Sequence, residues 1–217
     1  HTPWDPPEPY ASMYDPAEIP FPVRRDGELE EKHPRWADNI ARTIPATPPR
    51  SQDPERPGGI ERAYSRFPDA QLREMLAAYY GQITLIDHQI GRVLAALEAR
   101  GLGNNTLILF TSDHGDHLGN NWAVFKYGVQ YDSLARIPFI VNWPGRTDVG
   151  LRRSELVSLI DIAPTFLEAA GLTAVDSVDG ESLLPFCREG DAPWREQLVW
   201  PRHPACIVNA DWKYILW

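Results

Sequence analysis

The sequence has no run of apolar residues of membrane-spanning length, and it has few cysteines that could form disulfides. It contains only two cysteines, Cys187 and Cys206, which are too few for a disulfide framework. One disulfide is an alternative, but we favour two free buried thiols. Positive charge is also scarce, because 21 lysine and arginine residues against 30 aspartate and glutamate residues give a formal net charge of −9. We therefore expect no nucleic-acid partner and no membrane partner, and an anionic substrate would have to meet a local positive charge.

Proline is the abundant exception, with 21 residues in a chain of 217, and it is concentrated near the beginning. Proline removes a backbone donor and disfavours a helix at the residue before it. We therefore predict that residues 1–60 form an extended loop segment. A loop of that length is unusual inside an independent domain, so we expect it to connect parts of a larger protein.

Regular structure is predicted from about residue 69 onward. Apolar residues spaced by three and four predict a long helix over 69–100, with Pro68 in its first turn and Gly101 just after its end. The apolar run at 106–111 follows this helix and predicts a buried strand of a parallel sheet. A second buried strand is predicted over 137–143.

The later part of the chain changes in character. Asp161 is expected to cap a helix that ends before Gly171. Three short strands are predicted at 197–200, 205–208 and 213–217, with a turn at 209–211 between the last two. This pattern predicts a small antiparallel sheet at the end.

Residues with metal-binding chemistry follow the strand at 106–111. Residues 113–117 read Asp-His-Gly-Asp-His and offer carboxylates and imidazoles, which bind hard and borderline metal ions. Ligands of open α/β sheets bind outside the carboxyl ends of strands, and Asp113 and His114 can reach one ion if the backbone turns sharply at Gly115. The alternative is that the aspartate caps a turn and the histidines are surface residues. The spacing alone leaves both interpretations open.

Residues 105–145 resemble the signature of the sulfatase and phosphonate monoester hydrolase family of the alkaline phosphatase superfamily. The resemblance runs from Asn-Thr-Leu-Ile-Leu-Phe-Thr-Ser-Asp-His-Gly to Arg-Ile-Pro-Phe-Ile-Val-Asn-Trp-Pro-Gly. It covers nearly the whole chain and is densest at 80–217. In that family the aspartate and the following residue complete the site of one divalent cation, which implies that Asp113 and His114 bind Ca²⁺ or Mn²⁺.

Two further residues are implied as substrate ligands by the same resemblance. Lys126 stands thirteen residues after Asp113, which is the spacing of the phosphonate monoester hydrolase branch. His1, in His-Thr-Pro-Trp, resembles a histidine-x-proline element whose histidine contacts the substrate oxygens. The resemblance therefore assigns His1 and Lys126 to catalysis and substrate binding, and the alternatives are a solvated loop lysine and a chain-end histidine without a role. Asp116 and His117 are interpreted as loop residues.

The chain departs from the family pattern in one respect that concerns the reaction itself. The family nucleophile is a formylglycine, made from the Cys or Ser that begins a Cys/Ser-x-Pro-x-Arg motif. No such motif occurs in the 217 residues. We therefore expect the nucleophile, together with further metal-binding aspartates, in a missing N-terminal half of the same protein. The chain alone is expected to be inactive. Asn120 and Asn121 also replace a frequent Asp-His pair of the family.

The resemblance implies an α/β fold, namely part of an alkaline-phosphatase-like sheet sandwiched by helices, with a small C-terminal antiparallel sheet. We divide the chain into an extended segment at 1–60, the C-terminal part of the catalytic domain at 61–185 and the start of a small subdomain at 186–217. The implied function is metal-dependent hydrolysis of a small anionic ester, either a sulfate ester or a phosphonate monoester or phosphodiester.

Other interpretations of the same pattern remain open. The alternatives are another phosphodiesterase or a phosphomutase of the superfamily, and a truncated binding module without activity. The branch resemblance favours the cytoplasm, with a periplasmic or secreted location left open, and a homo-oligomer is also left open.

Overall fold

The computed structural model describes residues 4–31, 67–126, 130–173, 178–188, 190, 193–201 and 205–216. The chain forms two compact units. The first comprises His1–Ala96 together with His114–Arg136, and the second comprises Leu97–Asp113 together with Ile137–Trp217. His1 and the predicted extended segment beyond residue 31 lie outside the described residues.

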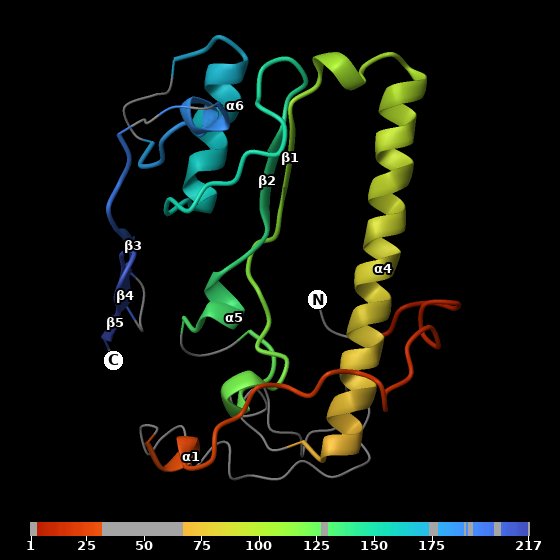
Figure 1. Ribbon diagram of the computed structural model, residues 1–217. Coiled ribbons are helices and arrows are strands. Elements are labelled where there is room, and N and C mark those ends of the chain that lie inside the picture. The colour runs from red at the N-terminus through yellow and green to blue at the C-terminus, as the bar shows by residue number, and fades with distance from the viewer. Residues whose placement is uncertain are drawn as a thin grey trace, which may run out of the picture. The chain divides into compact units, whose positions relative to one another are not determined.

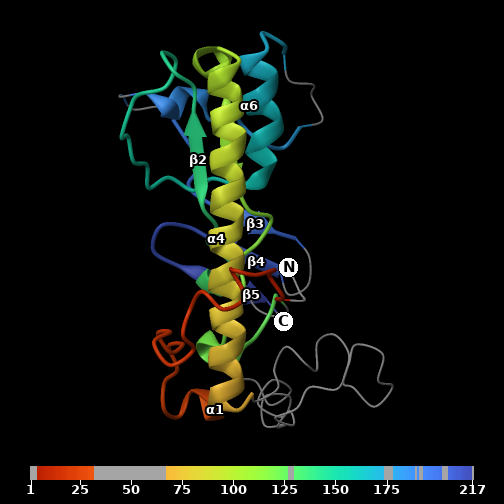
Figure 2. The same ribbon diagram turned by 90° about the vertical axis from the view of Figure 1, so that its right-hand side faces the viewer.

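The first unit contains α4 up to Ala96; the helix is unbroken from Asp69 to Ala99 (Figures 1 and 2). The helix confirms the prediction for 69–100, and Gly101 adopts the left-handed φ of +67° that suits the residue after a helix. The apolar face is buried in the N-terminal half of the helix. From Ile83 onward, four apolar side chains of the helix are exposed: Ile83, Ile86, Val93 and Leu94. None of the helices in the described part of the chain is long and apolar enough to cross a membrane.

Residues 4–31 run along the N-terminal half of α4 (Figure 1). Their one helix is the single turn α1, Glu28–Glu31. The guanidinium of Arg73 donates to the carbonyl oxygen of Ile19 at 2.7 Å, and the hydroxyl groups of Tyr14 and Thr84 are 2.7 Å apart. The buried core between this segment, α4 and the loop that follows residue 114 consists of Ile19, Phe67, Leu72, Leu76, Ala77 and Val124.

The second unit contains two strands that join antiparallel, β1 (Ile108–Thr111) and β2 (Phe139–Asn142). Thr111 pairs with Phe139, and Ile108 pairs with Asn142. The prediction of a parallel sheet is therefore wrong for this pair of strands. The predicted burial of the second strand is also wrong at Ile140, which is 57% exposed. An apolar run predicts that a strand packs against other parts of the protein, but it does not predict the direction of the neighbouring strand.

A short 3-10 helix, η3 (Leu159–Asp161), leads into α6 (Ile162–Ala169), and Gly171 follows with a φ of +72°. The predicted helix is confirmed, but the side chain of Asp161 does not cap it. The Asp161 carboxylate instead accepts the backbone N–H of Ser158 at 2.8 Å and that of Glu181 at 3.0 Å. The carboxylate thus joins the start of α6 to a segment twenty residues further on.

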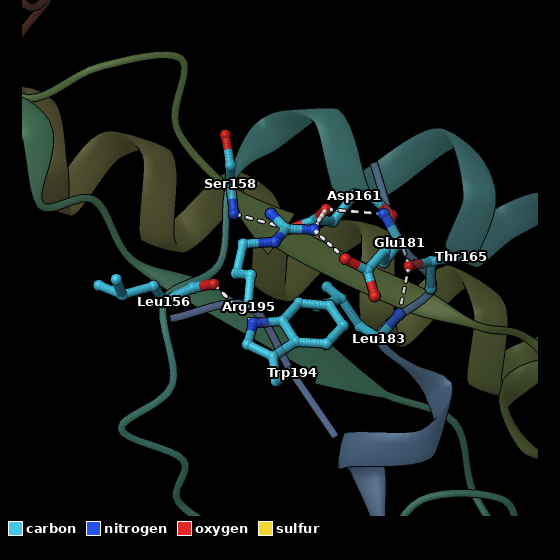
Figure 3. A network of polar contacts seen from close by, with 8 residues as sticks. All are labelled: Leu156, Ser158, Asp161, Thr165, Glu181, Leu183, Trp194 and Arg195. Carbon is cyan, nitrogen blue, oxygen red and sulfur yellow. Dashed lines mark hydrogen bonds and ion pairs between the residues drawn. The ribbon is translucent and has the colours of Figure 1, made fainter. Parts of the chain in front are cut away.

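Asp161 is also the centre of a polar network (Figure 3). Its side chain is fully buried, and the guanidinium of Arg195 donates to both carboxylate oxygens, at 2.9 Å and 2.5 Å. Thr165 extends the network, because its hydroxyl accepts the backbone N–H of Leu183 at 2.9 Å. The network fixes α6, the η4 turn (Leu184–Cys187) and the segment at 193–195 to one another.

The end of the chain forms the predicted antiparallel sheet, in the order β3 (Leu198–Trp200), β4 (Ala205–Val208) and β5 (Lys213–Leu216). The predicted turn is present, because the side-chain oxygen of Asn209 accepts the backbone N–H groups of Asp211 and Trp212. Cys187 and Cys206 are both free thiols, as favoured, although only Cys206 is buried.

Candidate active site

The candidate site begins where β1 ends. Asp113 lies two residues after the last residue of the strand, as predicted, and its carboxylate is on an exposed residue. The hydroxyl of Ser112 donates to one of its oxygens at 3.3 Å. A solvent-accessible carboxylate directly after a strand has the chemistry of a ligand for a hard cation.

His114 carries its ring in a defined tautomer. The Nδ1 atom is 2.7 Å from the carbonyl oxygen of Gly115. Because a carbonyl oxygen can only accept, Nδ1 carries the hydrogen in a neutral ring and Nε2 keeps the lone pair. That is the arrangement in which a histidine binds a metal ion, with the other ring nitrogen held by a backbone carbonyl.

Gly115 is needed for a close approach rather than for an unusual turn. A Cβ at this position would lie 2.1 Å from the carbonyl oxygen of Ser133. The backbone N–H of Gly115 donates to the carbonyl oxygen of Leu134 at 2.7 Å, within the short helix α5 (Asp132–Ala135). The expectation that Gly115 permits a sharp turn is therefore replaced by a packing reason, since its φ is not positive.

Beyond Gly115 the chain turns back on itself. The N–H of His117 donates to the carbonyl oxygen of Phe125 at 3.0 Å, and the N–H of Gly119 donates to that of Ala123 at 2.7 Å. The 3-10 turn η2 (Asn120–Trp122) closes this loop. Lys126 directly follows the last of these paired residues, so the loop returns it to the segment that begins at His114.

Lys126 is partly buried. Among the described residues, no carboxylate forms an ion pair with its ammonium group. That its ammonium points toward the same ion as Asp113 stays a prediction.

Asp116 and His117 lie in the loop, as interpreted from the sequence, but they are not fully solvated. His117 is fully buried, and its Nδ1 is 2.8 Å from the hydroxyl of Ser133. Burial raises the pKa of the Asp116 carboxyl, while the backbone N–H groups of Leu118 and Phe125 act in the opposite direction. No pattern in the sequence indicated this burial, because polar residues between glycines ordinarily predict a solvated loop.

An aromatic cluster lies beside the loop. The ring of Trp4 packs against those of Tyr79 and Phe125, with centroids 5.3 Å and 5.1 Å away. Burial, and secondarily the charge of Asp116, raises the pKa of the Tyr79 hydroxyl. The cluster places a residue near the start of the chain against the residue that precedes Lys126.

The metal-binding chemistry of the described residues is incomplete. Asp113 and His114 suit a divalent cation by donor type and tautomer, but no group of three or more His, Cys, Asp or Glu residues suitable for a metal ion occurs in the described part of the chain. His1, the predicted substrate ligand, lies outside that part.

A separate cavity of about 540 Å³ lies in the second unit, between α6 and the segments at 180–186 and 193–194. Its lining includes Glu168, Glu181 and Trp194 but none of the predicted site residues. We give it no role in the candidate site, since the predicted metal and substrate ligands are elsewhere in the chain.

Comparison with solved structures identifies the fold as that of alkaline-phosphatase-like hydrolases. The chain superimposes on the phosphonate monoester hydrolase of Silicibacter pomeroyi with a TM-score of 0.78 and 29% identity, covering 96% of this chain and 44% of that one. The corresponding enzyme of Agrobacterium radiobacter gives a TM-score of 0.76 and 27% identity, covering 99% and 46%. These likenesses confirm the predicted fold class.

Sequence comparison gives the family. The family model for sulfatases matches residues 1–172, and the chain belongs to the sulfatase family. It is 37% identical to an arylsulfatase of Clostridium perfringens, over 91% of this chain and 37% of that protein. It is 34% identical to the multifunctional alkaline phosphatase superfamily protein PehA of Trinickia caryophylli, over 91% and 38%. The chain therefore spans about two fifths of the length of these relatives.

Proposed function

We propose that this chain supplies the metal-and-substrate-binding part of a hydrolase that cleaves sulfate esters or phosphonate monoesters and phosphodiesters. Membership of the sulfatase family supports hydrolysis of an ester of this kind. The observation that carries the assignment of residues is the loop from Asp113 to Lys126. Three features support it: Asp113 follows β1, the Nδ1 atom of His114 is 2.7 Å from a carbonyl oxygen, and Lys126 follows Phe125, whose carbonyl oxygen accepts the N–H of His117.

The residues have distinct roles in this proposal. Asp113 and His114 hold one divalent cation, Ca²⁺ or Mn²⁺, and when bound the cation supplies Lewis-acid stabilisation of charge on the ester oxygens. The Lys126 ammonium binds the peripheral oxygens and meets charge that grows during the attack, so it contributes more to the transition state than to the ground state. His1 binds the same oxygens and can protonate the leaving oxygen, since an ordinary histidine pKa of about 6.5 permits it.

The nucleophile is outside this chain in our proposal. No Cys or Ser of the 217 residues begins an x-Pro-x-Arg motif, and the relatives are more than twice as long. The complete enzyme would contribute the formylglycine and the remaining metal ligands. The chain alone should therefore turn over aryl sulfate and aryl phosphonate far below the order of 10 per second that is ordinary for enzymes.

We favour phosphonate monoesters and phosphodiesters over sulfate esters as the main substrates. The support is the spacing of Lys126 from Asp113 and the TM-scores with two phosphonate monoester hydrolases. Both substrate classes are tetrahedral anions that present several oxygens to a cation, so charge alone separates them weakly. We therefore expect a modest preference and a measurable activity on both.

The test uses the complete enzyme that contains this sequence. We expect Asp113→Ala and His114→Ala each to weaken Mn²⁺ binding in calorimetric titration and to lower kcat/KM on 4-nitrophenyl phenylphosphonate. Asp211→Asn is the matched control, because this exposed aspartate lies in the turn between β4 and β5. Unchanged Mn²⁺ affinity in both site variants would refute the metal assignment. A preference for 4-nitrophenyl sulfate of about a hundredfold in kcat/KM, equivalent to about 2.7 kcal/mol, would reverse the substrate ranking.

A further inference from the structure

The short helix α5 packs its backbone against Gly115, the residue that follows the metal ligand we propose at His114. The backbone N–H of Gly115 donates to the carbonyl oxygen of Leu134 at 2.7 Å. A Cβ added to Gly115 would lie 2.1 Å from the carbonyl oxygen of Ser133 and 3.0 Å from its carbonyl carbon. A hydrogen bond and direct packing therefore both fix Gly115 against α5.

Gly115 in turn holds the ring of His114. Its carbonyl oxygen is 2.7 Å from the Nδ1 atom of that ring. A backbone carbonyl that accepts from a histidine ligand fixes the tautomer and the orientation of the ring and raises its basicity. A shift of the Gly115 backbone would therefore turn the imidazole and redirect the Nε2 lone pair that binds the metal ion.

The side chain of Ser133 joins α5 to the same loop. Its hydroxyl oxygen is 2.8 Å from the Nδ1 atom of His117, a fully buried ring in a T-shaped contact with Tyr131. α5 has only four residues, and a helix of that length is not stable on its own, so contacts with the rest of the protein hold it in place. The bond from Ser133 to His117 is one of these contacts.

His117 is a firm partner for this bond because the loop holds its backbone. Its N–H donates to the carbonyl oxygen of Phe125 at 3.0 Å. Its own carbonyl oxygen accepts the backbone N–H of Asn120 at 2.8 Å and the side-chain amide of the same residue at 2.9 Å. The Ser133 hydroxyl therefore joins α5 to a part of the loop that is itself fixed.

We propose that Ser133 is a positioning residue for His114 in metal binding. The inference rests on the proposed metal-binding role of His114. The bond from Ser133 to His117 holds α5 against Gly115, and the Gly115 carbonyl then holds the imidazole in the tautomer that binds the ion. Without the hydroxyl, the buried Nδ1 of His117 loses this partner, and α5 loses one of its attachments to the loop.

The first test is the metal affinity of the complete enzyme, measured by calorimetric titration with Mn²⁺. Ser133→Ala should weaken Mn²⁺ binding by about tenfold, the lower end of the range for groups that orient a metal ligand, because Ser133 acts through intervening contacts. Ser133→Thr keeps the hydroxyl and should retain most of the affinity. Ser12→Ala is the matched control, because it removes an exposed serine hydroxyl of the same unit from its bond to Glu8. This control should bind Mn²⁺ as the parent does.

A double-mutant cycle tests whether Ser133 acts through His117. His117→Phe keeps a ring of similar size, removes the ring nitrogens, and should also weaken Mn²⁺ binding. In this background Ser133→Ala should cause little further loss, because the partner of the hydroxyl is gone. Equal losses from Ser133→Ala in the parent and in His117→Phe would overturn the inference, because Ser133 would then act without His117.

The tautomer of His114 is a second readout, and it needs no bound metal ion. The ¹⁵N chemical shifts of the ring show which nitrogen carries the hydrogen, if they are recorded without metal above the ordinary histidine pKa of about 6.5. The parent and Ser12→Ala should have the hydrogen on Nδ1, and Ser133→Ala should have a mixture of the two tautomers. An unchanged tautomer in Ser133→Ala would refute the positioning role whatever the Mn²⁺ affinity, since any loss of affinity would then have another cause.

The affinity of His114→Ala separates this inference from the proposed function. If His114→Ala binds Mn²⁺ as the parent does, the metal-binding role of His114 fails, and positioning by Ser133 fails with it. If His114→Ala loses affinity while Ser133→Ala does not, the metal assignment stands and the positioning role of Ser133 is refuted.

Discussion

The buried pair of Arg195 and Asp161 permits a quantitative prediction of stability. Asp161 is fully buried, and the side chain of Arg195 is only 12% exposed. The carboxylate accepts four hydrogen bonds, two from the Arg195 guanidinium and two from backbone N–H groups (Figure 3). Arg195→Ala removes half of these bonds and leaves a buried negative charge with two neutral donors.

Breaking a buried ion pair by removing one partner costs about 3–5 kcal/mol, because the remaining charge stays desolvated. The Arg195 guanidinium also lies 4.6 Å from the ring centroid of Trp194, a contact that adds roughly 0.5–1 kcal/mol. Since Arg195 has little solvent around it, we apply the figure for buried pairs without a discount for screening. We expect Arg195→Ala to lower the free energy of unfolding by about 3.5–6 kcal/mol, the sum of the two contributions.

The assay is urea-induced unfolding of the complete protein, with the midpoint and slope of the transition compared between variants. Arg25→Ala is the matched control, because it removes the same residue type from an exposed ion pair with Glu31. An exposed ion pair contributes little to the free energy of unfolding, so this control should have the same urea midpoint as the parent. The reasoning is refuted if Arg195→Ala and Arg25→Ala have the same midpoint, since burial would then make no difference.

Two glycine substitutions should have opposite effects on stability, and the thiol of Cys206 gives two further predictions. Gly115→Ala should destabilise the loop by at least 1–3 kcal/mol, roughly the cost of overpacking, because the new Cβ would lie 2.1 Å from the Ser133 carbonyl oxygen. Gly91→Ala, in the exposed interior of α4 with nothing within 4 Å of the new methyl, should instead stabilise by about 0.5–1 kcal/mol; thermal unfolding of both variants checks the contrast. Burial raises the pKa of the Cys206 thiol, so iodoacetamide at pH 8 should modify Cys206 more slowly in the native protein than in urea, and equal rates would contradict its burial. The pKa of the Cys206 thiol is higher in the folded protein than the unfolded value of about 8.5, so the thiol stabilises the fold below that pH. This stabilisation is lost as the pH rises further. The difference in unfolding free energy between the parent and Cys206→Ala should therefore shrink above that pH.

Much of the secondary structure was predictable because it depends on local patterns. The helix at 69–100 follows from a period of three and four, and the turn at Asn209 follows from the side-chain chemistry of asparagine. The pairing of β1 with β2 was not predictable from their apolar runs, since direction depends on where the chain returns. The ends of α6 were correct, while the role of Asp161 required knowledge of Arg195, which lies 34 residues away.

The candidate site also has a part that could be predicted from the sequence and a part that could not. The prediction of Asp113, His114 and Lys126 as site residues rests on a spacing shared with a known family. The burial of His117 was not predictable, because nothing local distinguishes a buried polar side chain from a solvated one. The burial of His117 goes with its hydrogen bonds to Ser133 and to the backbone of Phe125, which only the folded chain brings near.

The central claim is that Lys126 binds the ester oxygens of a sulfatase-family hydrolase. The most direct measurement is kcat/KM of the complete enzyme on 4-nitrophenyl phenylphosphonate for Lys126→Ala, with Lys213→Ala on β5 as the matched control. Removing a preorganised charge at the reacting group costs about 10²–10³ in rate, so we predict a loss of that order in Lys126→Ala and parent activity in Lys213→Ala. Equal kcat/KM in Lys126→Ala and Lys213→Ala would contradict the account.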